Sequence, residues 1–270
     1  EEEINRIFIE IYGLQEELSP NVLEQDVTVK LADVTREVKS FISYAVGCMF
    51  GRYSLDREGI AYGGGNKFDL SEYSKYIPDA DNIIPICDDE YFADDIVGMF
   101  VNFVKTIFSE NTLEENLVFI ASAVGGKGAP RDVIRNYFLN EFYDDHIKTY
   151  QKRPIYWLFD SGKKNGFKCL IYMHRYMPDT IARIRTDYVH EQQSRYRTSI
   201  AAVEQKMNSA STNERVKLSR ELKTLQEQSE EIRKYEEKIH HLADQMVQIN
   251  IDDGVKSNYE IFKDVLYKIK

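Results

Sequence analysis

The sequence has few of the residues that would place it in several familiar classes of protein. It contains only 3 Cys, at the widely separated positions Cys48, Cys87 and Cys169, and no CxxC pair. This argues against both a disulfide framework and a zinc knuckle. With 6 Pro and 14 Gly in 270 residues, the chain also lacks the composition of a disordered or collagen-like protein.

Long hydrophobic runs are missing as well. No stretch approaches the roughly 18 uncharged apolar residues of a membrane span. No charged segment followed by an apolar segment suggests a signal peptide, so we expect a cytoplasmic protein without a membrane partner. The first residue is Glu1 rather than Met, and we therefore expect a piece of a longer protein.

Motifs for catalysis, cofactors and metals are absent too. Gly63–Gly65 does not follow the pattern of a phosphate-binding loop and is interpreted as a flexible turn. Gly125–Gly128 precedes Pro130 and offers two readings, an anion cradle at a helix start or a plain loop, of which we favour the loop. We assign no catalytic, cofactor-binding or metal-binding residue, and an independent enzyme is not expected.

What the sequence does have is an uneven distribution of charge. Residues 1–150 carry 28 Asp and Glu against 13 Lys and Arg, whereas residues 151–270 carry 17 against 22. Such asymmetry indicates either a surface that faces a polyanion or an acidic half that docks on a basic half. The candidate DNA-binding residues are Lys152, Arg153, Lys163, Lys164, Asn165, Lys168, Arg175, Arg183, Arg185, Arg195 and Arg197.

The first 150 residues predict one helix after another. Apolar residues recur at three- and four-residue spacings over 4–14, 34–49, 96–107 and 133–147. We expect a looser helix over Leu18–Leu31, and Asp88–Glu90 is predicted to open the helix that carries Ile96. Residues 52–83 are interpreted as an irregular surface loop. The interpretation is an acidic helical domain over residues 1–150.

The pattern changes at about residue 154. Ile155–Phe159 and Phe167–Met173 are rich in aromatic and branched residues and flank a polar, Gly-containing segment. This predicts a β-hairpin over about 154–176 with Lys163, Lys164 and Asn165 at its tip.

Two stretches with apolar residues seven apart follow over about 181–249. They are separated by the polar segment Asn208–Asn213, and a last helix is expected near Tyr259. The polar break favours an antiparallel helical hairpin over a parallel dimeric coiled coil. The predicted fold is mainly α, a multi-helix domain with a small β-hairpin and a C-terminal antiparallel, coiled-coil-like helical hairpin. The predicted second domain, residues 151–270, comprises the β-hairpin, the helical hairpin and the last helix.

Several blocks resemble one family of proteins. They are Glu2–Leu14 (EEINRIFIEIYGL), Phe41–Asp56 (FISYAVGCMFGRYSLD), Asn82–Ile86 (NIIPI), Arg153–Phe159 (RPIYWLF) and Leu170–Tyr176 (LIYMHRY). Together they resemble the C-terminal region of the PglX family, the adenine-specific DNA methyltransferases of BREX phage-defence systems. The RPIYW…HR pattern is also similar to Eco57I-like restriction–modification proteins.

The resemblance implies a parent protein that methylates adenine N6 with S-adenosylmethionine. In that family the catalytic Asn-Pro-Pro-Tyr motif and the Gly-rich cofactor motif lie in an N-terminal domain, and neither motif occurs in these 270 residues. The resemblance therefore implies a non-catalytic C-terminal portion, with no cofactor of its own.

Two roles for such a portion remain open. In the first, the basic stretch 152–197 helps hold double-stranded DNA, because phosphate contacts supply most of the grip on a duplex. In the second, the acidic half and the helical hairpin form a scaffold that braces the catalytic domain or docks other defence-system proteins, without direct DNA contact.

Overall fold

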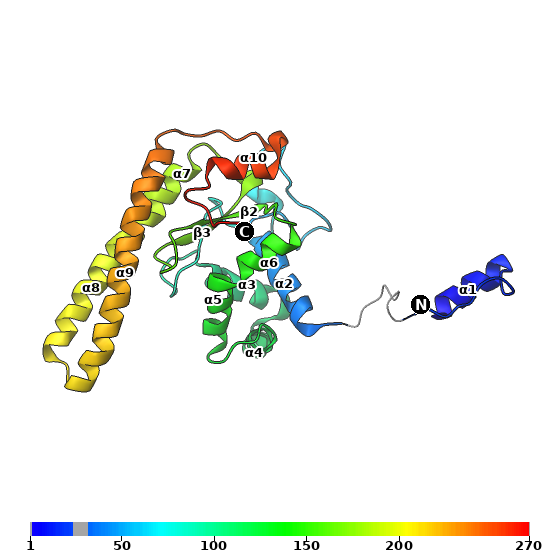
Figure 1. Cartoon of the computed structure of the whole chain (residues 1–270), viewed down its shortest axis with the longest axis horizontal. Coiled ribbons are helices and arrows are strands. Elements are labelled where there is room, and N and C mark those ends of the chain that lie inside the picture. The colour runs from blue at the N-terminus through cyan, green and yellow to red at the C-terminus, as the bar shows by residue number, and fades with distance from the viewer. Residues whose placement is uncertain (1, 24–31, 270) are drawn as a thin grey trace. The chain divides into compact units, whose positions relative to one another are not determined.

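The computed structural model describes residues 2–23 and 32–269. Contacts divide the chain into two compact units, Glu1–Glu37 and Val38–Lys270. The predicted fold class is confirmed, because the described residues are mainly helical and include one small antiparallel sheet (Figure 1).

The smaller unit contains α1 (Glu2–Tyr12), a helix whose side chains are all at least partly exposed. Gly13, with φ 67°, ends the helix in a left-handed conformation, and Asn5 Nδ2 donates to the carbonyl oxygen of Pro20 at 3.4 Å. The looser helix that we predicted over Leu18–Leu31 is not formed in the described part, which ends at Leu23. Residues 24–31 of that prediction lie outside the described residues.

The larger unit consists of helices grouped around the sheet (Figure 1). Its helices are α2 (Val34–Met49), which begins just before the unit, α3 (Ile96–Phe108), α4 (Leu113–Ala123), α5 (Pro130–Asn140), α6 (Phe142–Thr149), α7 (Thr180–Arg183), a π-helical segment (Ile184–Val189), α8 (His190–Ser209), α9 (Thr212–Ala243) and α10 (Gly254–Ile261). Within the described ranges, no helix combines the length and the apolar character that crossing a bilayer requires.

The sheet has the strand order β1-β3-β2, with both pairs antiparallel. Its strands are β1 (Ile84–Pro85), β2 (Tyr156–Asp160) and β3 (Lys168–Tyr172). The β2–β3 pair is the predicted β-hairpin, whereas β1 was not predicted. Every residue of β3 is buried, because helices cover both faces of the sheet. This explains why the strands are apolar over Tyr156–Phe159 and Cys169–Tyr172 rather than alternating.

One hydrophobic core runs through the larger unit. It joins Ile42 and Phe100 from the acidic part of the sequence to Trp157, Ile232 and Phe262 from the basic part. The predicted boundary at residue 150 therefore separates an acidic segment from a basic one. Side chains from both segments pack into the same core.

The start of α3 differs from the sequence prediction. Asp88–Glu90 do not open this helix, which begins only at Ile96. Asp95 is its N-cap, and its Oδ1 accepts hydrogen bonds from the backbone amides of Val97 (3.0 Å) and Gly98 (3.4 Å). The prediction was wrong because Asp88 and Asp89 are engaged with side chains from α8 and α9.

Gly51 lies in the turn that follows α2. A substitution at this position tests how closely the chain packs around the turn. It has φ 72°, and a Cβ atom added to it would lie 2.6 Å from the ring of Phe68 and 2.9 Å from the hydroxyl of Tyr73. We expect Gly51→Ala to lower the free energy of unfolding by more than the roughly 1–2 kcal/mol cost of left-handed backbone alone. Urea unfolding of the purified variant measures the loss.

Gly59→Ala is the matched control. Gly59 has a similar φ of 77°, but an added Cβ would have no atom within 4 Å. Only the backbone cost then applies. Equal losses for the two variants would show that the contacts with Phe68 and Tyr73 impose no constraint.

Candidate nucleic-acid interface

The helical hairpin is formed by α8 and α9, which pack against each other along their length (Figure 1). Ser211 begins α9 in a reciprocal capping box with Glu214. Val203 of α8 and Ile232, Tyr235 and Ile239 of α9 are buried along the apolar stripe. The antiparallel hairpin predicted from the seven-residue spacing is thus present within one chain.

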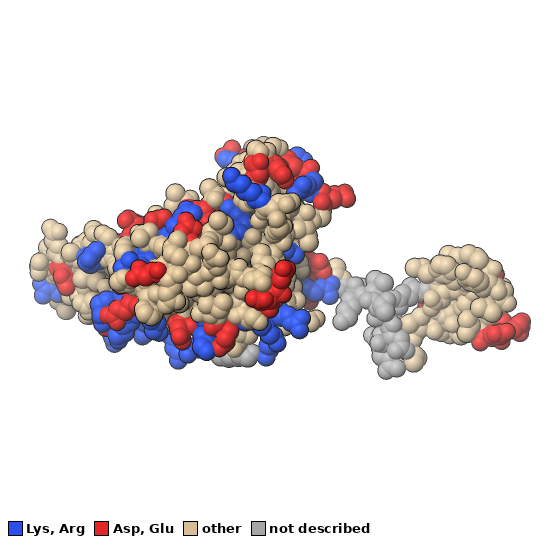
Figure 2. Space-filling model, turned by 90° about the horizontal axis from the view of Figure 1, so that it is seen from above, with Lys and Arg blue, Asp and Glu red and all other residues tan. Residues whose placement is uncertain are grey.

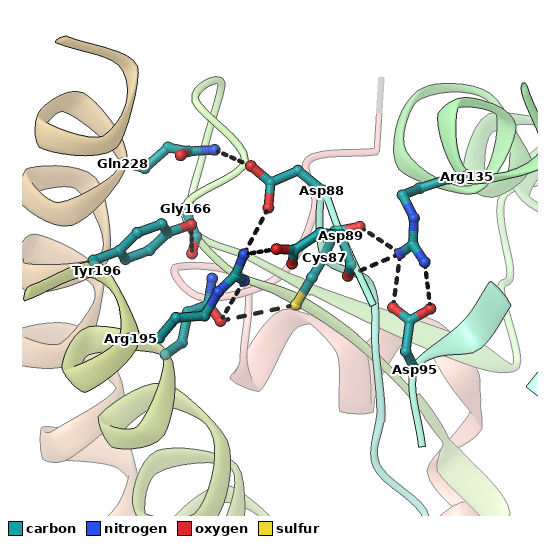
Figure 3. Close-up of polar contacts among 10 residues, drawn as sticks. Cys87, Asp88, Asp89, Asp95, Arg135, Gly166, Arg195, Tyr196 and Gln228 are labelled. Atoms are coloured by element: carbon teal, nitrogen blue, oxygen red, sulfur yellow. Dashed lines mark hydrogen bonds and ion pairs between the residues drawn. The ribbon is translucent and has the colours of Figure 1, made fainter. Parts of the chain in front are cut away.

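A cluster of polar contacts fastens this hairpin to the rest of the unit (Figure 3). Arg195 of α8 pairs with Asp89 and lies 3.7 Å from Asp88, and Gln228 of α9 donates to Asp88 at 3.0 Å. The hydroxyl of Tyr196 donates to the carbonyl oxygen of Gly166, in the loop between β2 and β3, at 3.0 Å. Both helices are therefore anchored near the same acidic segment.

Arg135 of α5 holds the other side of that segment (Figure 3). Its guanidinium donates to the carbonyl oxygens of Cys87 (2.9 Å) and Asp89 (3.1 Å) and makes a bidentate pair with Asp95, at 2.8 Å for each bond. Burial raises the pKa of the Cys87 thiol, so this cysteine stays protonated at neutral pH.

The loop between β2 and β3 lies against α9 and is not a free tip. The carboxylate of Glu231 accepts hydrogen bonds from Ser161 Oγ (2.9 Å) and from the amides of Lys164 (2.9 Å) and Gly166 (3.0 Å). Lys164 Nζ pairs with Glu227 at 2.6 Å. Of the three predicted tip residues, Lys163 is exposed and Asn165 is half-buried.

Several other predicted DNA-binding residues are also engaged within the protein. Arg183 pairs with Asp81 (3.0 Å), and Arg185 pairs with Glu236 (2.7 Å). Lys168 is buried and donates to the carbonyl oxygen of Leu139, and buried Arg175 donates to the carbonyl oxygens of Phe50 and Ala80. Lys168 and Arg175 thus present no charge at the protein surface.

Four candidates remain exposed and, within the described residues, have no ion pair. They are Lys152, Arg153, Lys163 and Arg197. The structure does not place all four together, because Lys152 and Arg153 precede β2, whereas Lys163 lies in the loop that follows this strand.

Sequence reasoning missed a further group of cations on the outer half of the helical hairpin. Lys206, Lys217, Arg220 and Lys223 are exposed and form no ion pair with any part of the chain that the structure describes. Figure 2 shows Lys and Arg side chains along the lower edge of the larger unit in that view, mixed with some Asp and Glu. The sequence contained a signal for this group. Lys217, Arg220 and Lys223 recur every three residues, which places them on the side of a helix opposite the apolar stripe.

Asp79, Asp81 and Asp94 also come together, with one oxygen of each within 4.8 Å of the others. Burial and the two neighbouring carboxylates raise the pKa of Asp79 to about 8. Asp81 accepts hydrogen bonds from Arg183 and from the hydroxyl of Tyr188. The positive charge that this cluster needs is therefore supplied in part by an arginine of the same chain.

Comparisons with known proteins show what the chain is similar to. No protein-family model matches the chain. Two curated relatives are both named adenine-specific methyltransferases. PglX from Lacticaseibacillus casei (strain Zhang) is 44% identical over 264 residues, which are 96% of this chain and 22% of the relative. BrxX from Escherichia coli O9:H4 (strain HS) is 41% identical over 247 residues, which are 86% of this chain and 20% of the relative.

The chain is therefore homologous to a segment of the PglX and BrxX adenine-specific methyltransferases, and the resemblance seen in the sequence is confirmed. It spans only about a fifth of the length of these relatives.

The buried pair between Arg135 and Asp95 can be tested directly. The two side chains are only 10% and 1% exposed. We expect Arg135→Leu to lower the free energy of unfolding by about 3–5 kcal/mol, because it leaves a buried carboxylate without its counter-charge. Chemical denaturation measures this loss.

Arg131→Leu on the same helix is the control. Arg131 makes a similar bidentate pair with Glu114, but its side chain is 43% exposed and that of Glu114 is 65% exposed. The expected cost is below about 1 kcal/mol. A comparable loss for both variants would contradict the role given to burial.

Proposed function

We propose that this chain is the non-catalytic C-terminal portion of an adenine-specific (N6) DNA methyltransferase of a phage-defence or restriction–modification system. Its task is to help hold double-stranded DNA and to brace the catalytic domain, while the parent protein supplies the S-adenosylmethionine site. The observation that carries the proposal is the 44% identity with a PglX methyltransferase over 96% of the chain.

The outer half of the helical hairpin is the surface we assign to DNA. Lys217, Arg220 and Lys223 lie on one side of α9, exposed and opposite the stripe that packs on α8. Lys206 and Arg197 add two further exposed cations on α8. Unpaired cations release counterions from the duplex when they contact phosphates, which is the main source of sequence-independent affinity.

We expect the triple variant Lys217→Ala, Arg220→Ala, Lys223→Ala of the full-length methyltransferase to bind duplex DNA more weakly. The slope of log affinity against log salt should decrease by about 0.9 for each phosphate that the variant no longer neutralises. A gel-shift titration at several salt concentrations measures both quantities.

Two matched variants accompany this test. The triple variant Lys217→Arg, Arg220→Lys, Lys223→Arg keeps the charge and should retain the wild-type salt slope. Arg233→Ala lies on the same helix but removes a cation that pairs with Glu230 and Glu237, so it should change DNA affinity little. An unchanged salt slope in the alanine variant would exclude this surface from DNA binding.

The smaller unit supports the bracing role. Ile4, Ile7, Phe8 and Ile11 form an apolar stripe on α1, and their exposed fractions are 48–69%. A helix of 11 residues is marginally stable alone in water, and most helical stability in proteins comes from packing an apolar face. We therefore assign this stripe to a contact with the catalytic domain of the same methyltransferase.

Docking of other defence-system proteins is the second candidate, and the same exposed stripe favours it. The two candidates differ in when α1 is covered. A contact with the catalytic domain protects the helix in the purified methyltransferase, whereas a scaffold contact protects it only after another subunit is added.

Hydrogen exchange of α1 in the full-length methyltransferase distinguishes them. We expect slow exchange in the wild-type protein and fast exchange in Ile7→Asp, Ile11→Asp, because two charges on the stripe oppose its burial. Glu3→Ser on the polar side should exchange like the wild type. Fast exchange in the wild-type protein, slowed only by added subunits, would favour the scaffold instead.

A further inference from the structure

Arg52 occupies an unusual environment immediately after the turn at Gly51. Its side chain is half-buried, its Nη1 donates to the hydroxyl of Tyr172 at 2.9 Å, and its Nε donates to the hydroxyl of Tyr53 at 3.4 Å. No carboxylate pairs with Arg52 within the described residues. Its charge is surrounded by phenol groups instead.

Unpaired polar atoms are concentrated around this arginine. Four buried side-chain atoms of the described residues have no hydrogen-bond partner, and three of them are His146 Nδ1, His174 Nδ1 and the hydroxyl of Tyr156. The rings are in contact, with centroids 4.8 Å apart for His146 and Tyr156, 5.5 Å for Tyr156 and Tyr172, and 4.9 Å for Tyr172 and His174. Tyr156 and His146 are only 1% and 3% exposed.

The protonation of His146 follows from its contacts. Burial, and then the charge of Arg52, lower its pKa to about 3, so the ring is neutral at physiological pH. Its Nε2 accepts a hydrogen bond from the backbone amide of Tyr156 at 3.2 Å. The proton of the neutral ring is therefore on Nδ1, which is a buried donor without an acceptor.

Two of the exposed cations follow Tyr150 in the chain, and Tyr150 belongs to the surroundings of Arg52. The phenol of Tyr150 interacts with both Arg52 and Tyr53, and the following residues Gln151 and Lys152 have positive φ angles of 50° and 60°. Left-handed backbone at residues other than glycine costs about 1–2 kcal/mol for each residue. The exposed residues Lys152 and Arg153 belong to this turn, which directly follows Tyr150 in the chain.

We propose that Arg52 is the centre of a binding site for a phosphate group, with Lys152 and Arg153 at its rim and the unpaired donors of His146 and Tyr156 behind it. A phosphate only accepts hydrogen bonds, and its paired oxygens match the fork of a guanidinium. It would supply the negative charge and the acceptors that the surrounding residues lack. The phosphate belongs either to a DNA backbone or to a free phosphate or nucleotide.

The test uses the full-length methyltransferase and inorganic phosphate at constant ionic strength, with chloride as the reference anion. Phosphate should raise the unfolding temperature of the wild-type protein and shift the ¹⁵N signal of His146 Nδ1. In Arg52→Gln the affinity for phosphate should fall about tenfold or more, which corresponds to about 1.4 kcal/mol or more. Arg57→Gln is the matched control, because Arg57 is a nearby exposed arginine that pairs with Glu72 at 3.4 Å.

Arg52→Lys keeps the site testable if the glutamine variant does not fold. It retains the charge but loses the fork, so its affinity for phosphate should be measurably weaker than that of the wild type. Wild-type affinity in either Arg52 variant would overturn the proposal. So would a wild-type protein that shows no response to phosphate, since the unpaired atoms would then hold water only.

A second measurement separates the two sources of phosphate. If Arg52→Gln also weakens binding of a duplex oligonucleotide, the site takes a backbone phosphate, and if it weakens only inorganic phosphate, the site takes a free phosphate or nucleotide. The triple alanine variant of the helical hairpin should keep its full response to inorganic phosphate. A failure of the hairpin to bind DNA is thereby distinguished from a failure of the Arg52 site.

Discussion

The arrangement of the larger unit depends on one acidic segment, Cys87–Asp89, held between two arginines from distant parts of the chain. Arg135 of α5 donates hydrogen bonds to the carbonyl oxygens of Cys87 and Asp89, and Arg195 of α8 forms an ion pair with the carboxylate of Asp89. Because Gln228 of α9 donates to the same segment, both helices of the hairpin are fixed to the body at one place. Glu231 of α9 adds a second attachment, to the loop between β2 and β3, so the direction in which the outer half of the hairpin points is set at its base.

This constraint also explains how the uneven charge of the sequence is used. Much of the basic stretch 152–197 neutralises acids of residues 1–150 or of α9, as the pairs of Arg183 with Asp81 and Arg185 with Glu236 show. The interpretation of an acidic half docking on a basic half describes Arg183 and Arg195, whereas Lys164 and Arg185 pair with acids of α9 in the basic half itself. Among the cations that form no ion pair within the described residues, Arg197, Lys206, Lys217, Arg220 and Lys223 lie on the helical hairpin beyond its anchored base.

The sequence predicted those elements whose signal is local. The seven-residue spacing of apolar residues predicted the helical hairpin, and the aromatic runs of β2 and β3 predicted the β-hairpin. β1 was missed because Ile84 and Pro85 form a strand only through pairing with Leu170 and Cys169, which lie far away in the sequence. The start of α3 was misplaced for a similar reason, since the three acids at 88–90 resemble a helix start until the partners of Asp88 and Asp89 in α8 and α9 are known. The engagement of Lys168 and Arg175 inside the protein depends equally on distant backbone carbonyls.

Comparison among the arginines of this unit shows why Arg52 stands apart. The guanidinium of Arg135 pairs with a carboxylate, that of Asp95. The guanidinium of Arg175 donates to two backbone carbonyl oxygens, and its central carbon lies 3.7 Å from the ring centre of Phe68. Within the described residues, Arg52 pairs with neither a carboxylate nor a backbone carbonyl oxygen, although its guanidinium carbon lies 5.5 Å and 6.0 Å from the ring centres of Tyr53 and Tyr172. Phenol oxygens can accept from it only by directing their own protons elsewhere, as Tyr172 does toward the carbonyl oxygen of Tyr62 at 3.0 Å. A cation surrounded by groups that also need acceptors leaves an excess of donors, and an anion from outside the chain corrects that excess.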